Sequence, residues 1–112
     1  MKIYHNPRCA KSRAGLKYLE EKGVEFEIVK YLQEGIGEEE LTGIIAKTGK
    51  KPFDFVRTQE REYKEQYKGK NLTDQEWIKL LVKNPKLLQR PIIVKGNKAV
   101  LGNPPENIDG IV

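Results

Sequence analysis

The sequence predicts an α/β fold, and three observations support this class. The chain opens with a strand, a helix and a second strand, its middle is helical in pieces, and it closes with a strand hairpin followed by a helix start. A chain of 112 residues can bury well over half of its unfolded surface around one core. We therefore expect residues 1–112 to form a single domain.

The opening strand and helix meet at the only cysteine of the chain. Residues 2–5 are typical of a short strand, which the following Asn-Pro pair ends. Residues 10–22 are typical of a helix that starts directly after Cys9 and ends at a glycine. Residues 24–29 alternate apolar side chains with glutamates, which predicts a half-buried second strand.

The rest of the chain predicts more helices and a closing hairpin. Residues 38–48 place apolar side chains at helical spacing after three glutamates. Residues 52–84 are helical in pieces and include the capping-box sequence TDQE at 73–76. Residues 91–101 form two apolar runs around a Gly-Asn turn, and the prolines at 104 and 105 can start a last helix. This element order predicts a thioredoxin-like fold, with a mixed four-stranded sheet flanked by helices and a helical insertion at about residues 52–84.

Composition limits the function classes. With 38% apolar and 33% charged residues and a mean hydropathy of −0.67, the chain is typical of a charged globular protein. One cysteine and one histidine allow neither an internal disulfide nor a closed zinc site of sulfur and nitrogen ligands, so we expect no bound metal. The apolar runs are short and the N-terminus lacks a signal-peptide core, so we expect a cytoplasmic protein with no membrane partner.

The net charge of +5 and the pI near 9.3 favour anionic partners. Lysines and glutamates alternate along the chain, however, which is typical of a solvated surface of mixed sign. No pattern of stacking aromatics or helix-turn-helix accompanies the charge, so we expect no nucleic-acid partner.

Cys9 is the candidate nucleophile. A thiolate at a helix N-terminus is stabilised by the first-turn amides and by nearby cations, here Lys11 and Arg13. Ser12 stands where a CxxC motif has its second cysteine, so its hydroxyl can donate a hydrogen bond but cannot form a disulfide. A lone cysteine is often a buried small side chain, but a strand-loop-helix junction at a sheet edge favours a reactive one. His5, four residues before Cys9, is a candidate for tuning the thiolate.

The phosphate-binding loop of low-molecular-weight phosphatases is excluded by spacing. That loop has an arginine where this chain has Gly15, and Arg13 is too close to Cys9 to replace it. An oxyanion at Cys9 must therefore be neutralised by arginines from elsewhere in the chain.

Four segments resemble one known family in order and spacing, nearly end to end. They are YHNPRCAKSR at 4–13, FDFVRTQE at 53–60, LLQRPIIV at 87–94 and LGNPPENI at 101–108. They resemble the ArsC/Spx family, in particular its glutaredoxin-linked arsenate reductases. The resemblance implies that Cys9 is the nucleophile toward arsenate, and that Arg57 and Arg90 bind the oxyanion.

The resemblance also implies supporting roles and one departure. His5, Ser12 and Arg13 are expected to support the thiolate, and Pro91 is expected to be the cis-proline that faces the cysteine in thioredoxin folds. The third arginine of the family corresponds to Asn103, which donates hydrogen bonds but carries no charge. Losing one arginine contact to an anion costs on the order of 1.5–3 kcal/mol, so we expect weakened binding, for which Arg8 or Lys11 could compensate.

Two functions follow from the resemblance. The first is arsenate reduction by a monomer with no bound cofactor, which uses glutathione or an equivalent thiol as co-substrate and glutaredoxin as partner. Asn103 leaves a related oxyanion or thiol adduct open as the substrate. The second is an Spx-like redox-responsive regulator that binds RNA polymerase, although Ser12 removes the second thiol of its typical switch. Without the resemblance, Arg57 could equally be a surface ion-pair partner of Asp54 or Glu60.

Overall fold

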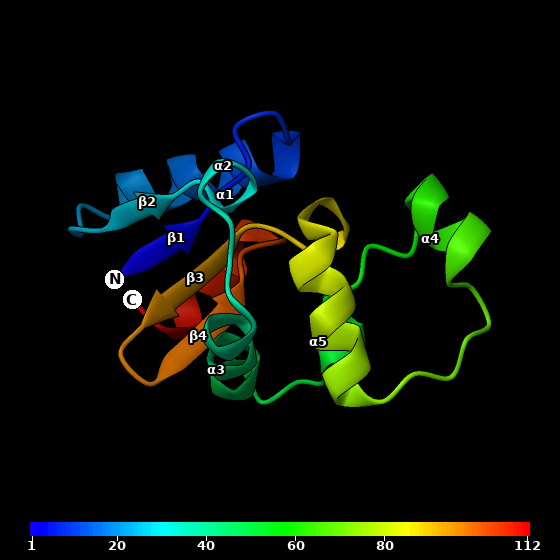
Figure 1. Cartoon of the computed structure of the whole chain (residues 1–112). Coiled ribbons are helices and arrows are strands. Elements are labelled where there is room, and N and C mark those ends of the chain that lie inside the picture. Colours follow the sequence, from blue (N-terminus) through cyan, green and yellow to red (C-terminus); the bar gives the residue numbers. More distant parts are fainter.

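The computed structural model describes residues 1–112 and contains a four-stranded sheet in the order β2-β1-β3-β4 (Figure 1). β1 pairs in parallel with β2 and antiparallel with β3, and β3 and β4 form the predicted hairpin. The strands are β1 (Lys2–Tyr4), β2 (Glu27–Val29), β3 (Ile92–Lys95) and β4 (Lys98–Leu101). The sheet is therefore mixed, as the sequence predicts.

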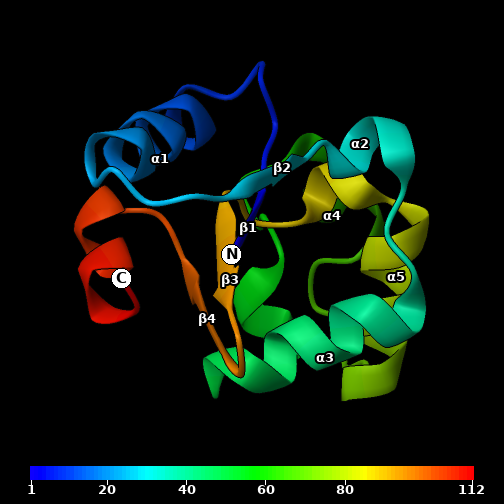
Figure 2. The same cartoon turned by 90° about the vertical axis from the view of Figure 1, so that its left-hand side faces the viewer.

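Helices cover both faces of this sheet (Figure 2). On one face, α1 (Ala10–Glu21) and the closing 3₁₀ helix Pro105–Gly110 pack over Ile3 and Ile93. On the other face, α3 (Glu38–Thr48) and α5 (Asp74–Lys83) pack over the neighbouring residues of the same strands, because successive strand side chains point to opposite faces. This two-sided arrangement confirms the predicted thioredoxin-like fold.

The predicted helical insertion is also present. It consists of a 3₁₀ turn at Pro52–Phe55, α4 (Arg61–Gln66) and α5. Thr73 caps α5, because its hydroxyl accepts from the backbone N–H of Glu76 while the Glu76 carboxylate accepts from the N–H of Thr73. α4 lies at the far end of the molecule from β2 (Figure 1).

An aromatic cluster links the 3₁₀ turn at Pro52–Phe55 to α4 and α5. The ring centroid of Phe53 lies 5.0 Å from that of Trp77 and 6.4 Å from that of Tyr63. Trp77 and Tyr63 are 4% and 8% exposed, so these aromatic side chains are packing residues.

The second strand differs from the prediction. β2 begins at Glu27 instead of residue 24, and Ile28 is 41% exposed whereas Val29 is buried. β2 is the edge strand beside β1, so Ile28 lies at the margin of the face that α1 covers, and Val29 packs into the core of the opposite face. One short helix, α2 (Tyr31–Glu34), was not predicted. No helix of the protein has the length and apolar character needed to cross a bilayer.

Candidate functional site

The chain segments that carry the predicted site residues meet where the four strands end nearest Cys9. We call this row of strand ends the Cys9 edge of the sheet. The register places Tyr4 between Val29 on one side and Ile92 on the other, with Leu101 beyond Ile92. The chain leaves β1 and β2 at this edge, enters β3 there, and leaves β4 there. Four segments therefore adjoin the same strand ends: the loop to Cys9, the start of α2, the Arg90–Pro91 segment and the turn after β4.

Cys9 is the N-cap residue of α1. Its backbone is extended (φ −96°, ψ 123°), and its side chain makes no capping hydrogen bond. The Cys9 N–H donates to the Asn6 carbonyl at 3.1 Å, and the Cys9 carbonyl accepts from the N–H of Arg13 at 3.0 Å. The thiol is partly exposed. Cys9 is thus fixed at the helix start with its sulfur accessible.

The surroundings of Cys9 lower its pKa. Burial acts in the opposite direction and would raise the pKa of the thiol. It is outweighed by the nearby backbone N–H of Ser12, by the side chain and the charge of Arg90, and by the nearby N–H of Lys11. The thiolate is therefore stabilised by the first turn of α1 and by an arginine from the segment before β3.

Ser12 connects the end of β1 to α1. Its side chain is fully buried, and its Oγ accepts from the N–H of Asn6 at 2.9 Å and lies 2.7 Å from Nδ1 of His5. Burial, followed by the charge of Lys30, lowers the pKa of His5, so the imidazole is neutral near pH 7. Nδ1 of the neutral imidazole and the Ser12 hydroxyl are therefore hydrogen-bonded to each other. The sequence predicts that the hydroxyl donates to the thiolate, but it bonds to His5 and Asn6, and it is the nearby backbone N–H of Ser12 that lowers the pKa of Cys9.

Arg13 braces the loop. Its Nη1 donates to the carbonyl of Pro7 at 2.9 Å at the surface, and Arg13 is not among the main causes of the lowered pKa of Cys9. Its predicted support of the thiolate is therefore indirect in this geometry, acting through the loop that carries Cys9.

Arg90 and Pro91 lie next to α1. The Arg90–Pro91 peptide bond is cis. The Pro91 ring packs so closely on Gly15 that a Cβ there would lie 2.5 Å from Cγ of Pro91. Nη1 of Arg90 donates to the carbonyl of Lys86 at 3.0 Å, whereas its Nε is buried and has no hydrogen-bond partner.

Arg57 is an ion-pair partner in this structure. Its Nη2 and Nε lie 3.0 and 3.1 Å from the same carboxylate oxygen of Glu60, and its side chain is only 12% exposed. The Arg57 N–H donates to the carbonyl of Leu87 at 2.7 Å, which ties it to the segment that leads to Arg90. The ion pair with Glu60 that the sequence leaves open is therefore present. The charge of Arg57 also acts on the pKa of the Tyr31 hydroxyl, as do the charges of Arg90 and Cys9.

Tyr31 is the residue that sequence reasoning missed. It opens α2, is fully buried, and its hydroxyl has no hydrogen-bond partner. The signal that could have found it is its position, because it directly follows the strand that pairs in parallel with β1.

Asn103 is the one predicted oxyanion-binding residue that no contact joins to the others. It follows β4 at the same edge of the sheet, but it lines a surface cavity of about 280 Å³ together with Thr48 and Lys50. No hydrogen bond links its side chain to Cys9, Arg57 or Arg90. The structure thus brings Cys9, His5, Ser12, Arg90 and Pro91 together, places Arg57 beside them, and leaves Asn103 outside.

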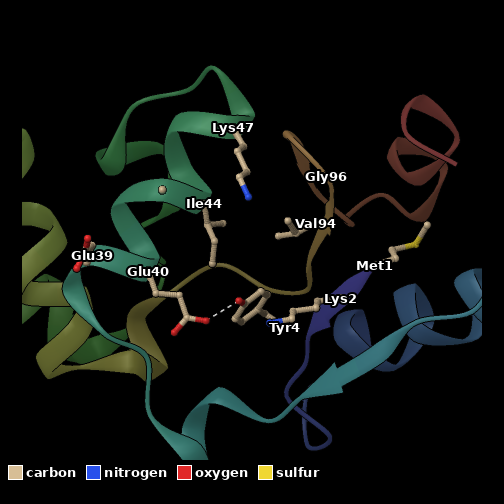
Figure 3. A pocket seen from close by; sticks show the side chains of 10 residues that line it. Met1, Lys2, Tyr4, Glu39, Glu40, Ile44, Lys47, Val94 and Gly96 are labelled. Atoms are coloured by element: carbon tan, nitrogen blue, oxygen red, sulfur yellow. Dashed lines mark hydrogen bonds between the residues drawn. The ribbon is translucent and has the colours of Figure 1, made fainter.

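A larger cavity, of about 430 Å³, lies at the opposite end of the strands (Figure 3). It is lined by Lys2 of β1, by Val94 of β3 and by residues of α3. Its central contact is a 2.6 Å hydrogen bond from the Tyr4 hydroxyl to the carboxylate of Glu40. That contact pairs the two groups, and the cavity does not include Cys9 among its lining residues.

Comparison with known proteins agrees with this geometry. The model of the ArsC family matches residues 4–111. A protein of Neisseria meningitidis serogroup A named arsenate reductase is 40% identical over 100% of this chain and 97% of its own length. The uncharacterized protein YfgD of Escherichia coli K12 is 41% identical over 100% of this chain and 96% of its own length. The solved structure of the arsenate reductase from Vibrio cholerae superposes with a TM-score of 0.92 at 36% identity, covering 100% of this chain and 98% of that one. With a family model that matches almost every residue and relatives that match it end to end, the chain belongs to the ArsC family.

Proposed function

We propose that this protein is an arsenate-reductase-type thiol oxidoreductase in which Cys9 is the nucleophile and an external thiol supplies the electrons. One observation carries the proposal most directly, namely the partly exposed Cys9 thiol with a lowered pKa beside an arginine whose buried Nε has no partner. A nucleophile beside an unpaired cation fits a substrate that is an anion and an electrophile at once. Relatives named arsenate reductase support arsenate as that substrate.

The first step forms a bond between Cys9 and arsenic. The Cys9 thiolate attacks arsenate, a sulfur–arsenic bond forms, one arsenic–oxygen bond breaks, and the departing oxygen leaves as water after taking up protons. Arg90 and the N–H groups of Lys11 and Ser12 stabilise the remaining oxygens. Arg57 joins them by exchanging the Glu60 carboxylate for a substrate oxygen, so that its charge stays paired while Glu60, whose side chain is 37% exposed, turns to solvent.

The electrons come from outside the chain. Reduction of arsenic from the +5 to the +3 state takes two electrons, which two thiols supply when they become one disulfide. Glutathione attacks the adduct first and displaces a second oxygen as water. A glutaredoxin thiol then attacks the glutathione sulfur, which forms the disulfide and leaves the electron pair on arsenic. Water finally releases arsenite from Cys9. Because the chain has a single cysteine, it cannot supply either of these two thiols itself.

The test is a coupled assay with arsenate, glutathione, glutaredoxin, glutathione reductase and NADPH. We expect NADPH consumption that depends on Cys9 and is lost in Cys9→Ser. Asn103→Arg adds the charge that the family motif has at this position, and we expect it to raise kcat/KM for arsenate about tenfold. Asn97→Arg, which adds the same charge in the exposed β3–β4 turn, is the matched control and should change nothing.

Two results would contradict the proposal. Turnover that is absent in the wild type but gained in Asn103→Arg would show that this chain is not an efficient arsenate reductase. Tight binding of RNA polymerase without any arsenate turnover would instead support a regulator of the Spx type.

A further inference from the structure

The hydroxyl of Tyr31 is a buried donor without an acceptor. The residue is 0% exposed and belongs to the main hydrophobic core, yet its oxygen makes no hydrogen bond. Buried polar groups are nearly always paired, because an unpaired one has lost its bonds to water and gained none in return. Only one other buried side-chain nitrogen or oxygen in the protein lacks a partner, and it is Nε of Arg90. Both unpaired atoms therefore belong to residues at the Cys9 edge of the sheet.

The fold places Tyr31 beside the nucleophile. β2 pairs with β1 up to the Tyr4–Val29 step, and the N–H of His5 continues the pairing by donating to the carbonyl of Val29 at 2.9 Å. Two residues later the chain reaches Tyr31, whose hydroxyl lies within the electrostatic reach of Arg90, Cys9 and Arg57. These are the proposed nucleophile and the two arginines proposed to bind its substrate.

The hydroxyl stays protonated in this position. Burial raises the pKa of Tyr31 to about 12, although the charge and the nearby side chain of Arg90 and the charge of Arg57 act to lower it. A protonated phenol has one hydrogen to donate, and the Nε of a guanidinium is also a donor. The phenol oxygen can accept from the Arg90 guanidinium, but the phenol hydrogen then still needs an acceptor of its own.

We propose that Tyr31 is a further substrate-contacting residue, whose buried hydroxyl and the Nε of Arg90 donate hydrogen bonds to oxygens of the oxyanion that Cys9 attacks. This inference rests on the proposed function, because it takes the ligand to be the anionic substrate of Cys9. Arsenate and phosphate offer several oxygen acceptors on one centre, so one anion can serve the hydroxyl and the guanidinium together. Tyr31 thereby supplies a neutral donor in a chain that has Asn103 in place of a third arginine.

The test measures anion binding apart from turnover. In the Cys9→Ser background, arsenate and inorganic phosphate are titrated calorimetrically into protein carrying Tyr31 or Tyr31→Phe. We expect Tyr31→Phe to weaken both affinities about tenfold, as for the loss of one hydrogen bond to a charged group. Tyr63→Phe is the matched control, since it removes the same oxygen from another buried tyrosine that belongs to the aromatic cluster of the insertion. Equal affinities in Tyr31→Phe and the control would overturn the inference.

Stability separates substrate contact from a structural role. A hydroxyl without a partner stabilises nothing, so Tyr31→Phe should unfold at the same temperature as the wild type or a higher one. A clear loss of stability in Tyr31→Phe would show that the hydroxyl has a structural partner and would overturn the inference.

A double-mutant cycle with Arg90→Gln separates direct contact from positioning. If Tyr31 touches the anion, Tyr31→Phe still weakens phosphate binding when Arg90 is already replaced. If that second loss vanishes, Tyr31 acts only by holding Arg90, and substrate contact is refuted.

The two proposals fail in different ways. Wild-type turnover with an unchanged KM for arsenate in Tyr31→Phe refutes the role of Tyr31 and leaves the proposed function intact. Absence of turnover together with Tyr31-dependent phosphate binding refutes arsenate reduction and supports the anion site. Absence of any anion binding by the Cys9→Ser protein contradicts the role of Tyr31, whatever the turnover.

Discussion

At the scale of single residues, Cys9 depends on groups from two distant parts of the chain. The N–H groups of Lys11 and Ser12 could be anticipated from the sequence, because a cysteine before a helix faces the first-turn amides. The contact with Arg90 could not be derived from spacing, since it arises only when β3 pairs antiparallel with β1. The family resemblance pointed to Arg90, and the sheet register gives the physical reason.

We predict that Arg90→Gln raises the pKa of the Cys9 thiol. The nearby side chain and the charge of Arg90 both lower this pKa, so their removal leaves less thiolate at pH 7. The pH profile of iodoacetamide alkylation measures the change, which should move the midpoint to higher pH. Arg13→Gln is the informative contrast, because it removes an equal charge that binds the Pro7 carbonyl. An equal rise in both variants would show that net charge, and not contact, activates the thiol.

We predict that His5 makes the protein less stable in mild acid. Its pKa in the folded protein is lowered, chiefly by burial, so the unfolded chain takes up the proton at higher pH than the folded one. The stability is fully present above the unfolded pKa, near 6.5, and is lost progressively as the pH falls toward the folded pKa. Between pH 7 and pH 5 the urea midpoint should therefore fall more steeply in the wild type than in His5→Asn, whose amide oxygen can still accept from Ser12. Parallel profiles would contradict this role of His5.

At the scale of elements, the site depends on how closely α1 approaches the sheet. Gly15 and Gly102 both contact Pro91, and the N–H of Gly102 donates to the Pro91 carbonyl at 2.7 Å. A side chain at either position would push α1 or the turn after β4 away from the proline. The positions of Cys9 at the start of α1 and of Arg90 before Pro91 are therefore linked through this packing.

We predict that Gly15→Ala destabilises the protein by about 1–3 kcal/mol, as is usual for overpacking. The new Cβ would lie 2.5 Å from the Pro91 ring and 3.2 Å from the carbonyl oxygen of Gly102, so α1 must shift and thiolate formation at Cys9 should fall with it. Urea unfolding and thiol alkylation measure the two effects. Gly43→Ala in α3 is the control, because nothing lies within 4 Å of its Cβ position, and it should stabilise the helix by about 0.5–1 kcal/mol. A neutral result for Gly15→Ala would show that this packing is looser than the distances indicate.

At the scale of the whole molecule, one core joins the sheet to the insertion. A cluster of 18 buried residues includes Tyr4 and Ile92 of the sheet as well as Trp77 and Leu81 of α5. The sequence predicted the elements on both sides of this core from periodicity, capping and turn residues. It could not predict that Ile28 is exposed or that Tyr31 is buried, because both depend on which strand lies at the edge and how far the helices reach over it.

We predict that the sheet and the insertion unfold together in a single transition. The only tryptophan, Trp77, reports on the insertion by its fluorescence. The only cysteine reports on the sheet edge, since the surroundings that lower the pKa of Cys9 are lost when the chain unfolds and its pH profile of alkylation then shifts upward. Coincident urea midpoints for the two probes are expected for one cooperative domain. An earlier midpoint for Trp77 would show that the insertion is a separate unit.

The two unpaired atoms at the Cys9 edge also bear on how such a chain can evolve. Selection for a stable fold alone favours loss of the Tyr31 oxygen, since phenylalanine fills the same space without a buried hydroxyl that lacks an acceptor. In a descendant that no longer bound the anion, substitutions to phenylalanine at position 31 would therefore be favoured, even if Cys9 were retained. The hydroxyl of Tyr31 is in this sense a more sensitive record of continued use of the site than the nucleophile itself.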